Sequence, residues 1–188
     1  MIPSAFISGL QRWRLAPRLR RIRLVVCDVD GVLTDGGLHY DEDGRVVKRF
    51  DVRDGLAVRM LQQAGLTVAL MSGGRGGATV ERARHLNIDH CRVEVSNKLE
   101  GLLHLRRDLA MDRDQTAFLG DDLNDLSVRP ATGLLIATAD AAAGLRRQAD
   151  WILRRRGGDA VLREFSEALL ASQGWLQRFE QAGMGIAN

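Results

Sequence analysis

Two acidic residues with a single residue between them stand at the end of a short apolar segment. The segment covers residues 24–29, Asp28 lies inside it, and Asp30 follows directly before Gly31. A strand that ends in such a pair aims both carboxylates at one place beyond the sheet edge, where open α/β sheets bind ligands. Neighbouring carboxylates repel each other unless a cation or a shared proton offsets the repulsion. A hard cation such as Mg²⁺ is therefore expected, because it prefers oxygen ligands and often binds together with a substrate's phosphate.

The elements that must position these acids alternate between strands and helices. Strands are expected over residues 24–29, 66–71, 91–95, 115–119, 134–137 and 151–153, and helices over residues 54–64, 78–86, 98–109, 123–128, 141–149 and 159–172. Residues 36–50 predict a β-hairpin, because two strand-like segments flank a turn signal at Asp43-Gly44. The alternation and the unbroken apolar strands predict an α/β fold with a doubly wound, mainly parallel sheet and a hairpin insertion.

Length and composition indicate one soluble domain. The chain of 188 residues is long enough for a sizeable core and too short for two comfortable domains. We expect the domain to cover residues 23–172, with a basic extension over residues 1–22 and a weakly held tail over residues 173–188. No apolar stretch approaches the roughly 20 residues of a membrane span. No signal-peptide pattern follows the first residues.

Cysteine content and charge bear on the compartment and on partners. Cys27 and Cys91 are the only cysteines, and the lack of a disulfide framework favours a reducing cytoplasm. The pI near 9.4 accompanies a net charge of only +3, so we expect no nucleic-acid partner. The arginines within residues 12–23 are interpreted as part of a solvated extension, although they could also touch a membrane surface, an acidic partner or RNA. A second basic cluster, at residues 154–156, is a candidate for binding an anionic substrate.

Further reactive residues follow other expected strands or begin expected helices. They are Ser72, Lys98, Asp121, Asp122 and Asp125. Taken singly, each has a plainer interpretation as a turn residue, a solvated cation or an acid at a helix N-terminus. Together with Asp28 and Asp30, in this order, they resemble the four motifs of the haloacid dehalogenase-like phosphotransferases, and the match runs from residue 24 to about residue 165.

This resemblance implies hydrolysis of a phosphate ester in two steps, through an aspartyl phosphate. Asp28 would attack the phosphorus atom as the nucleophile. Asp30 would protonate the departing alkoxide and then accept a proton from the attacking water. Lys98 would neutralise charge on the phosphoryl oxygens, and Ser72 would hold another of these oxygens.

The same resemblance implies a Mg²⁺ site. Its ligands would be the carboxylates of Asp28 and Asp121 and the main-chain carbonyl of Asp30. Asp122 and Asp125 would lie outside the ligand set and orient metal-bound waters.

The intervals between the motifs leave no room for a cap domain. One hairpin and one helix fill the interval from Asp28 to Ser72, and one helix and one strand fill that from Lys98 to Asp121. Many haloacid dehalogenase-like enzymes enclose small substrates with a domain inserted there. An open site also admits a macromolecular substrate, so the missing cap leaves the substrate open.

Three further segments narrow the resemblance. Residues 28–36, residues 50–55 with Arg59, and residues 157–164 are similar to the capless 3-deoxy-D-manno-octulosonate 8-phosphate (KDO 8-phosphate) phosphatases. This family implies a cytoplasmic homotetramer that forms through the hairpin, with each site completed by a neighbouring subunit, and a role in lipopolysaccharide biosynthesis. Arginines suit an acidic sugar, because a guanidinium can bind a carboxylate in a bidentate manner. The implied substrate contacts are Asp30, Asp51, Val52, Arg53, Asp54, Gly55, Arg59, Arg82 and Lys98.

The chain departs from this family at several positions. The arginine that the family carries at position 74 is Gly74 here, and Arg75 is expected to replace it as a substrate contact. The family's asparagine at position 51 is Asp51, and Asp159 and Leu162 are unusual in the C-terminal motif. Two alternatives therefore stay open beside KDO 8-phosphate: a phosphatase for a 9-phosphate nonulosonic (sialic-acid-like) sugar, and a non-catalytic binding module with this fold.

Overall fold

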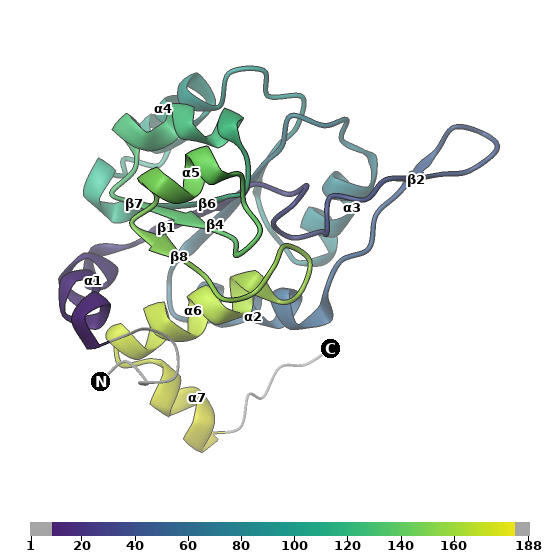
Figure 1. Cartoon of the computed structure of the whole chain (residues 1–188). Helices are drawn as coiled ribbons and strands as arrows, with labels where there is room; N and C mark the ends of the chain where they lie inside the picture. The colour runs from purple at the N-terminus through teal and green to yellow at the C-terminus, as the bar shows by residue number, and fades with distance from the viewer. Residues whose placement is uncertain (1–8, 183–188) are drawn as a thin grey trace.

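The computed structural model describes residues 9–182, in which helices cover both faces of a parallel β-sheet (Figure 1). The strands are β1 (Leu24–Cys27), β4 (Thr67–Met71), β5 (His90–Arg92), β6 (Thr116–Gly120), β7 (Leu134–Ala137) and β8 (Trp151–Ile152). Their order in the sheet is β5-β4-β1-β6-β7-β8, and every neighbouring pair is parallel. The chain builds one half of the sheet outward from β1, then returns to β6 on the other side. This is the predicted doubly wound topology.

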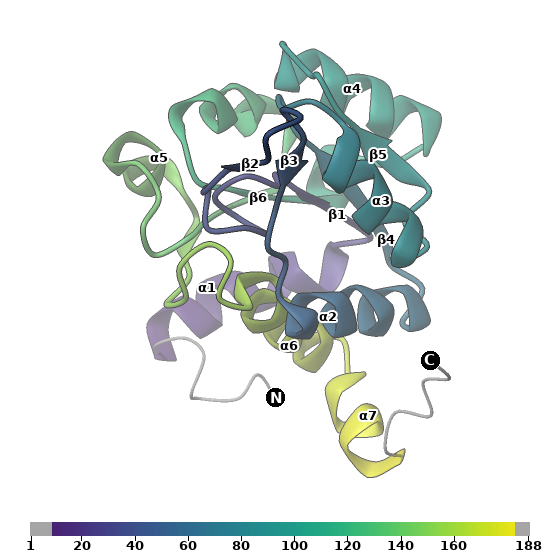
Figure 2. The same ribbon diagram turned by 90° about the vertical axis from the view of Figure 1, so that its right-hand side faces the viewer.

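The helices divide between the two faces of this sheet. On one face lie α1 (Gly9–Arg21), α2 (Val52–Gln63), α3 (Gly77–His85) and α6 (Val161–Ser172), and on the other lie α4 (Lys98–Asp108), the 3₁₀ helix η2 (Leu123–Ala131) and α5 (Ala143–Gln148). Figure 2 shows α2 and α6 side by side beneath the sheet. Along β1, Val25 and Cys27 belong to the first core, whereas Leu24 and Val26 belong to the second. This division follows from the alternation of side chains along a strand.

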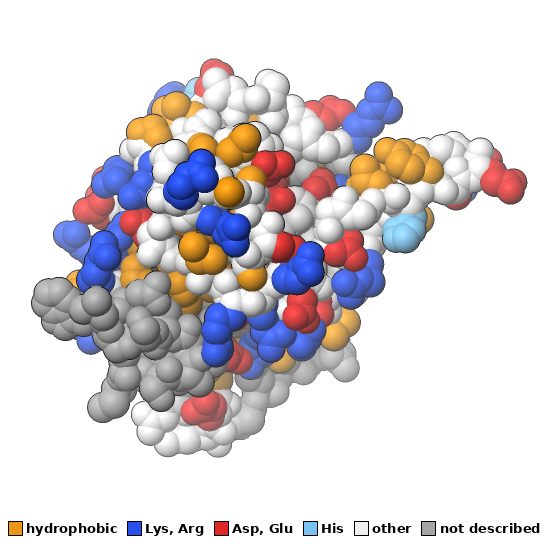
Figure 3. Space-filling view, viewed as in Figure 1, with side chains coloured by type: hydrophobic (Ala, Val, Ile, Leu, Met, Phe, Trp, Pro, Cys, Tyr) orange, Lys and Arg blue, Asp and Glu red, His pale blue; other side chains and the backbone are white. Residues whose placement is uncertain are grey.

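A short β-hairpin projects from the body of the molecule (Figures 1 and 3). Its strands, β2 (His39–Tyr40) and β3 (Val46–Val47), pair antiparallel, as the turn signal at Asp43-Gly44 predicts. Three apolar side chains of the hairpin segment are exposed: Leu38 by 47%, Tyr40 by 67% and Val47 by 57%. Apart from this hairpin, no additional domain interrupts the fold between residues 9 and 182, so the expectation of a capless architecture is confirmed.

The N-terminal segment is more closely packed than a solvated extension would be. Helix α1 places Leu15 and Leu19 in the core. Arg18 pairs with Asp150 at 2.9 Å, and Arg21 with Asp114 at 3.1 Å. These contacts differ from the expected solvated extension, because arginines dominate the composition of the segment while its apolar side chains repeat at helical spacing. Residues 1–8 lie outside the described part of the chain.

The C-terminal segment also differs from the expected weakly held tail. After a short turn it forms helix α7 (Leu176–Ala182), and Leu176 is buried. Trp175 stacks on Phe179 with ring centroids 6.0 Å apart. The domain boundaries at residues 22 and 172 stay predictions. Among residues 9–182, no helix is long and apolar enough to cross a membrane.

Candidate active site

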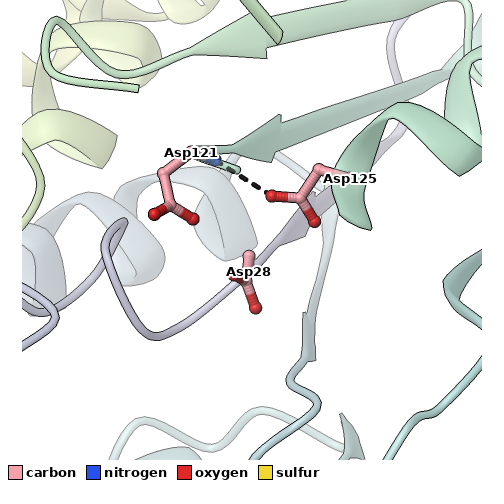
Figure 4. A group of neighbouring side chains, drawn as sticks. All are labelled: Asp28, Asp121 and Asp125. Atoms are coloured by element: carbon pink, nitrogen blue, oxygen red, sulfur yellow. Dashed lines mark hydrogen bonds between the residues drawn. The ribbon is translucent and has the colours of Figure 1, made fainter. Parts of the chain in front are cut away.

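Three carboxylates converge at the C-terminal ends of β1 and β6 (Figure 4). One oxygen from each of Asp28, Asp121 and Asp125 lies within 4.8 Å of the other two. Asp28 directly follows β1 and Asp121 directly follows β6. Because these strands are parallel neighbours in register, their ends deliver both acids to the same edge of the sheet. The topology therefore joins residues that are far apart in the sequence.

A buried lysine compensates the charge of this acid cluster. Lys98 Nζ lies 2.6 Å from Asp125 Oδ1 and 3.1 Å from Asp28 Oδ1, and the lysine side chain is only 3% exposed. Asn97 caps α4 by accepting a hydrogen bond from the main-chain N–H of Glu100, so Lys98 is the first residue of that helix. The cap sets the position from which the ammonium group reaches both acids.

Asp125 has no free carboxylate oxygen. Its Oδ2 accepts hydrogen bonds from the main-chain N–H groups of Asp121 at 2.9 Å and Asp122 at 3.3 Å, while Lys98 occupies Oδ1. A β-carbon at Gly120 would overlap Asp125 Oδ2, so glycine is required for this close approach. Asp122 is exposed and caps η2 by accepting from Leu123 N at 2.7 Å. The two acids thus hold the loop that presents Asp121.

The remaining pair, Asp28 and Asp121, has the chemistry of a divalent-cation site. Burial, together with the charge of Asp125, raises the pKa of Asp28 to about 6, against the opposing effect of Lys98. Burial, followed by the charges of Asp28 and Asp125, raises the pKa of Asp121 to about 8. Asp121 Oδ1 is buried and has no hydrogen-bond partner within residues 9–182. Mg²⁺ fits here, because a hard cation would supply the missing partner of this oxygen and offset the repulsion.

Asp30 lies beside Ser72 and a lysine that the sequence analysis did not single out. Asp30 Oδ2 accepts hydrogen bonds from Ser72 Oγ at 3.3 Å and from Lys48 Nζ at 2.8 Å. Ser72 Oγ in turn accepts from Gly74 N at 3.0 Å. Lys48 follows two valines in the returning arm of the hairpin, and nothing in that local pattern distinguishes it from a solvated strand residue. Only the folded arm brings it to Asp30.

The Gly157-Gly158 segment supports the loop that follows Asp30. A β-carbon at Gly157 would overlap the carbonyl oxygen of Gly31, so no residue with a side chain fits there unless the backbone shifts. Gly158 has φ +70° and donates its N–H to Val32 O at 2.9 Å. The glycines that contributed to the substrate resemblance therefore act on the backbone of residues 31–35.

The remaining predicted substrate contacts gather near the start of α2 and on α3. A surface cavity of about 310 Å³ is lined by Val52, Gly55, Arg59 and Arg82, among other residues. Arg82 is partly buried, donates to Asp51 O at 3.1 Å and lies over the Phe50 ring at 5.5 Å. Burial lowers the pKa of Arg82 from its ordinary value. This cavity offers guanidinium groups to an anion.

Other predicted substrate contacts have protein partners. Arg53 pairs with Asp51 at 2.7 Å and with Asp159 at 2.8 Å. Asp54 is 4% exposed and accepts from Arg163 N at 2.9 Å, and burial raises its pKa to about 7. Their roles toward substrate stay predictions.

Arg75 and the basic cluster at residues 154–156 differ in their contacts with other protein groups. Arg75 is exposed and makes no hydrogen bond or ion pair with any described residue. In the cluster over residues 154–156, Arg155 pairs with Asp159 at 3.4 Å and Arg156 with Asp140 at 3.1 Å. These pairings give the cluster a local role in holding its own loop.

The parallel sheet and its acid cluster indicate the class of protein, and comparisons with known proteins identify the family within that class. Residues 78–165 match the family described as haloacid dehalogenase-like hydrolase. The chain is 38% identical over 165 residues to the 3-deoxy-D-manno-octulosonate 8-phosphate phosphatase KdsC of Haemophilus influenzae, covering 88% of this chain and 92% of that protein. It is 37% identical over 169 residues to the KdsC protein of Escherichia coli K12, covering 90% and 89% of the two chains.

A solved structure is also similar to this chain. The 3-deoxy-D-manno-octulosonate 8-phosphate phosphatase of Moraxella catarrhalis, in complex with magnesium ion, phosphate ion and KDO, superposes with a TM-score of 0.87 at 31% identity. The match covers 90% of this chain and 97% of that one. The chain therefore belongs to the 3-deoxy-D-manno-octulosonate 8-phosphate phosphatase family of haloacid dehalogenase-like hydrolases.

Proposed function

We propose that this protein is a Mg²⁺-dependent phosphatase that hydrolyses KDO 8-phosphate to KDO and phosphate. The observation that carries the proposal is the cluster of Asp28, Asp121 and Asp125 around the buried ammonium of Lys98. This cluster lies at the carboxyl ends of adjacent parallel strands in a chain that belongs to the phosphatase family. Mg²⁺ would be held by the carboxylates of Asp28 and Asp121 and the main-chain carbonyl of Asp30. When bound, the ion would withdraw negative charge from the phosphoryl group.

The first step would transfer the phosphoryl group to Asp28. A carboxylate oxygen forms a bond to phosphorus while the ester P–O bond breaks, and Asp30 gives a proton to the departing sugar alkoxide. Lys98 lies against Asp28 at 3.1 Å, where its charge can face the phosphoryl oxygens. Ser72, beside Asp30, would donate a hydrogen bond to another of these oxygens.

The second step would release phosphate from Asp28. Asp30, now ionised, accepts a proton from water, whose oxygen attacks phosphorus as the bond to Asp28 breaks. The result is free phosphate, an ionised Asp28 and a protonated Asp30, ready for another turnover. Asp122 and Asp125 would maintain the loop that carries Asp121, as their hydrogen bonds to its main chain support.

Substrate selection would depend on the arginines near α2 and α3. Arg59 and Arg82 line the same cavity and would bind the sugar carboxylate. Asp51, Val52, Arg53, Asp54 and Gly55 complete the proposed contact set. Arg75, which is exposed and has no described protein partner, would contribute little to binding. Gly74 and Asp51 differ from the family pattern near this region, and they keep a 9-phosphate nonulosonic sugar as the second candidate substrate.

We also propose a cytoplasmic homotetramer. The exposed Leu38, Tyr40 and Val47 support an interface at the hairpin, because apolar side chains gathered on a projecting element favour burial against another chain. In such an assembly a neighbouring subunit would cover the open site and exclude water.

The proposal is tested by phosphate release from KDO 8-phosphate and from a 9-phosphate nonulosonic acid, each with and without Mg²⁺. We expect Mg²⁺-dependent release, faster from KDO 8-phosphate, and its abolition by Asp28→Asn. Equal, low rates on both sugars would refute the substrate assignment. Metal-independent release, or full activity of Asp28→Asn, would refute the mechanism. A properly folded wild-type protein that is inactive on every phosphate ester would leave the binding module as the better description.

A further inference from the structure

The hairpin contributes a buried cation to the site through Lys48. Its side chain is 4% exposed, and its Nζ lies 2.7 Å from Asp30 Oδ1 and 2.8 Å from Oδ2. A further hydrogen bond, to Thr79 Oγ1 at 3.4 Å, connects the same ammonium to α3. A lysine is seldom buried unless its charge is paired, so this contact is a defined part of the fold.

The two oxygens of Asp30 have different surroundings. Oδ2 takes aligned hydrogen bonds from both Lys48 and Ser72. Oδ1 is buried and close to the ammonium, but no hydrogen bond is aligned with it among the described residues. Lys48 therefore contacts both oxygens and Ser72 bonds to Oδ2, so together they fix the orientation of the carboxylate.

Gly74 makes room for this arrangement. A β-carbon at position 74 would stand 3.1 Å from Asp30 Oδ2 and 3.7 Å from Lys48 Nζ. The cation at this point of the site is thus Lys48, which reaches it from the hairpin, whereas the neighbouring Arg75 is exposed. Lys48 also lines a surface cavity of about 550 Å³ together with Phe50 and Arg82, so it lies between the acid cluster and the proposed sugar contacts.

We propose that Lys48 is a positioning residue: it fixes the Asp30 carboxylate for proton transfer and makes that alignment depend on how the hairpin is held. The inference rests on the proposed phosphatase function, in which Asp30 protonates the leaving group. Lys48 acts through Asp30, so its loss matters most where the leaving group needs a proton. An alkyl ester such as KDO 8-phosphate has this requirement. The leaving group of p-nitrophenyl phosphate is stable as an anion and does not.

The test compares Lys48→Met and Lys48→Arg with wild type in single-turnover and steady-state experiments on both esters. We expect Lys48→Met to slow alkyl-ester cleavage about 10²-fold, in the range for losing a positioned general acid. Release of p-nitrophenolate in the first transfer step should change less than about 3-fold, and KM for either ester should stay within about 2-fold of wild type. Lys48→Arg should recover part of the alkyl-ester rate, because it retains a cationic donor.

A double variant separates positioning from other roles. In the Asp30→Asn background, adding Lys48→Met should slow alkyl-ester cleavage almost no further, because the group on which Lys48 acts is already lost. Arg107→Met, at an exposed position of α4 outside the hairpin and the site, is the control and should behave as wild type. Thermal melting establishes that each variant is folded.

Three results with Lys48→Met would overturn the inference. Equal losses on both esters in the first step would show that Lys48 does not act through the proton donor. A raised KM with unchanged turnover would make it a substrate contact. If wild type itself releases no phosphate, the proposed function fails. If wild type is active and Lys48→Met matches it on both esters, only the role of Lys48 fails.

Discussion

Lys98 of α4 donates a hydrogen bond of 2.6 Å to Asp125 of η2, and both side chains are buried. The same ammonium lies 3.1 Å from Asp28. One cation therefore connects α4 to Asp125 of η2 and to Asp28 at the end of β1. The Lys98 ammonium therefore contributes both to the stability of the fold and to the charge balance of the site, because removing it would leave carboxylates uncompensated.

Replacing Lys98 should reduce both stability and activity. For Lys98→Met we expect a loss of about 3–5 kcal/mol in the free energy of unfolding without Mg²⁺, the usual effect of breaking a buried pair. Urea denaturation followed by circular dichroism measures this loss. Arg107→Met, an exposed arginine on the same helix, is the control and should stay within about 0.5 kcal/mol of wild type. Equal stability of the two variants would contradict this account of Lys98.

Stability without metal should fall as the pH rises from about 4 to 8. The pKa values of Asp28, Asp121 and Asp54 in the folded protein are about 6, 8 and 7, all above the ordinary value of 3.8. The folded state therefore holds protons that the unfolded state has released, and stability declines with pH across this window. Urea midpoints between pH 4 and pH 8, in the presence of a chelator, measure the decline.

Mg²⁺ should counteract part of that decline. The ion would bind the ionised forms of Asp28 and Asp121, so the stabilisation it provides should grow from pH 5 to pH 8. Asp54 accepts a hydrogen bond from the main chain of α6, so its contribution to the pH dependence of stability should not change with Mg²⁺. A magnesium effect that is constant with pH would contradict the assignment of the two acids as ligands.

Adding one methyl group at position 157 should disturb the loop after Asp30. In Gly157→Ala the new β-carbon would meet the backbone of Gly31, so the loop must shift. We expect the free energy of unfolding to fall by about 1–3 kcal/mol, the usual effect of overpacking in a protein interior. We also expect slower turnover. Gly77→Ala is the matched control, because a β-carbon there meets nothing within 4 Å. Equal melting temperatures and rates for the two variants would show that the contact is unimportant.

Arg82 and Arg75 should differ as substrate contacts. Arg82→Ala removes a partly buried guanidinium from the cavity beside α2, and we expect KM for KDO 8-phosphate to rise about 10-fold or more. Arg75→Ala removes an exposed side chain without a described protein partner, and KM should change less than about 2-fold. Steady-state kinetics on both variants measures the difference. A large rise in KM for Arg75→Ala would instead support Arg75 as the replacement for the arginine missing at position 74.

Local sequence patterns were sufficient for much of the fold. The sequence predicted each strand of the sheet, several of them as apolar runs that end near a glycine, and boundaries differ by a few residues where ends are set by pairing, as at β5 (His90–Arg92). The amphipathic spacing in α1 was obscured by its arginines, whose partners Asp114 and Asp150 lie far along the chain. Composition alone does not reveal such long-range pairing.

The sequence by itself determined which residues are reactive and in what order, because Asp28, Lys98 and Asp121 each stand where a local pattern ends or begins. Parallel pairing of β1 with β6 then decided that they meet. Only the tertiary structure brought Lys48 to Asp30 and Gly157 to Gly31, since both contacts depend on where a hairpin arm and a distant loop come to rest. The positions of the hairpin arm and of this loop are set by packing across the whole sheet, so no short stretch of sequence predicts them.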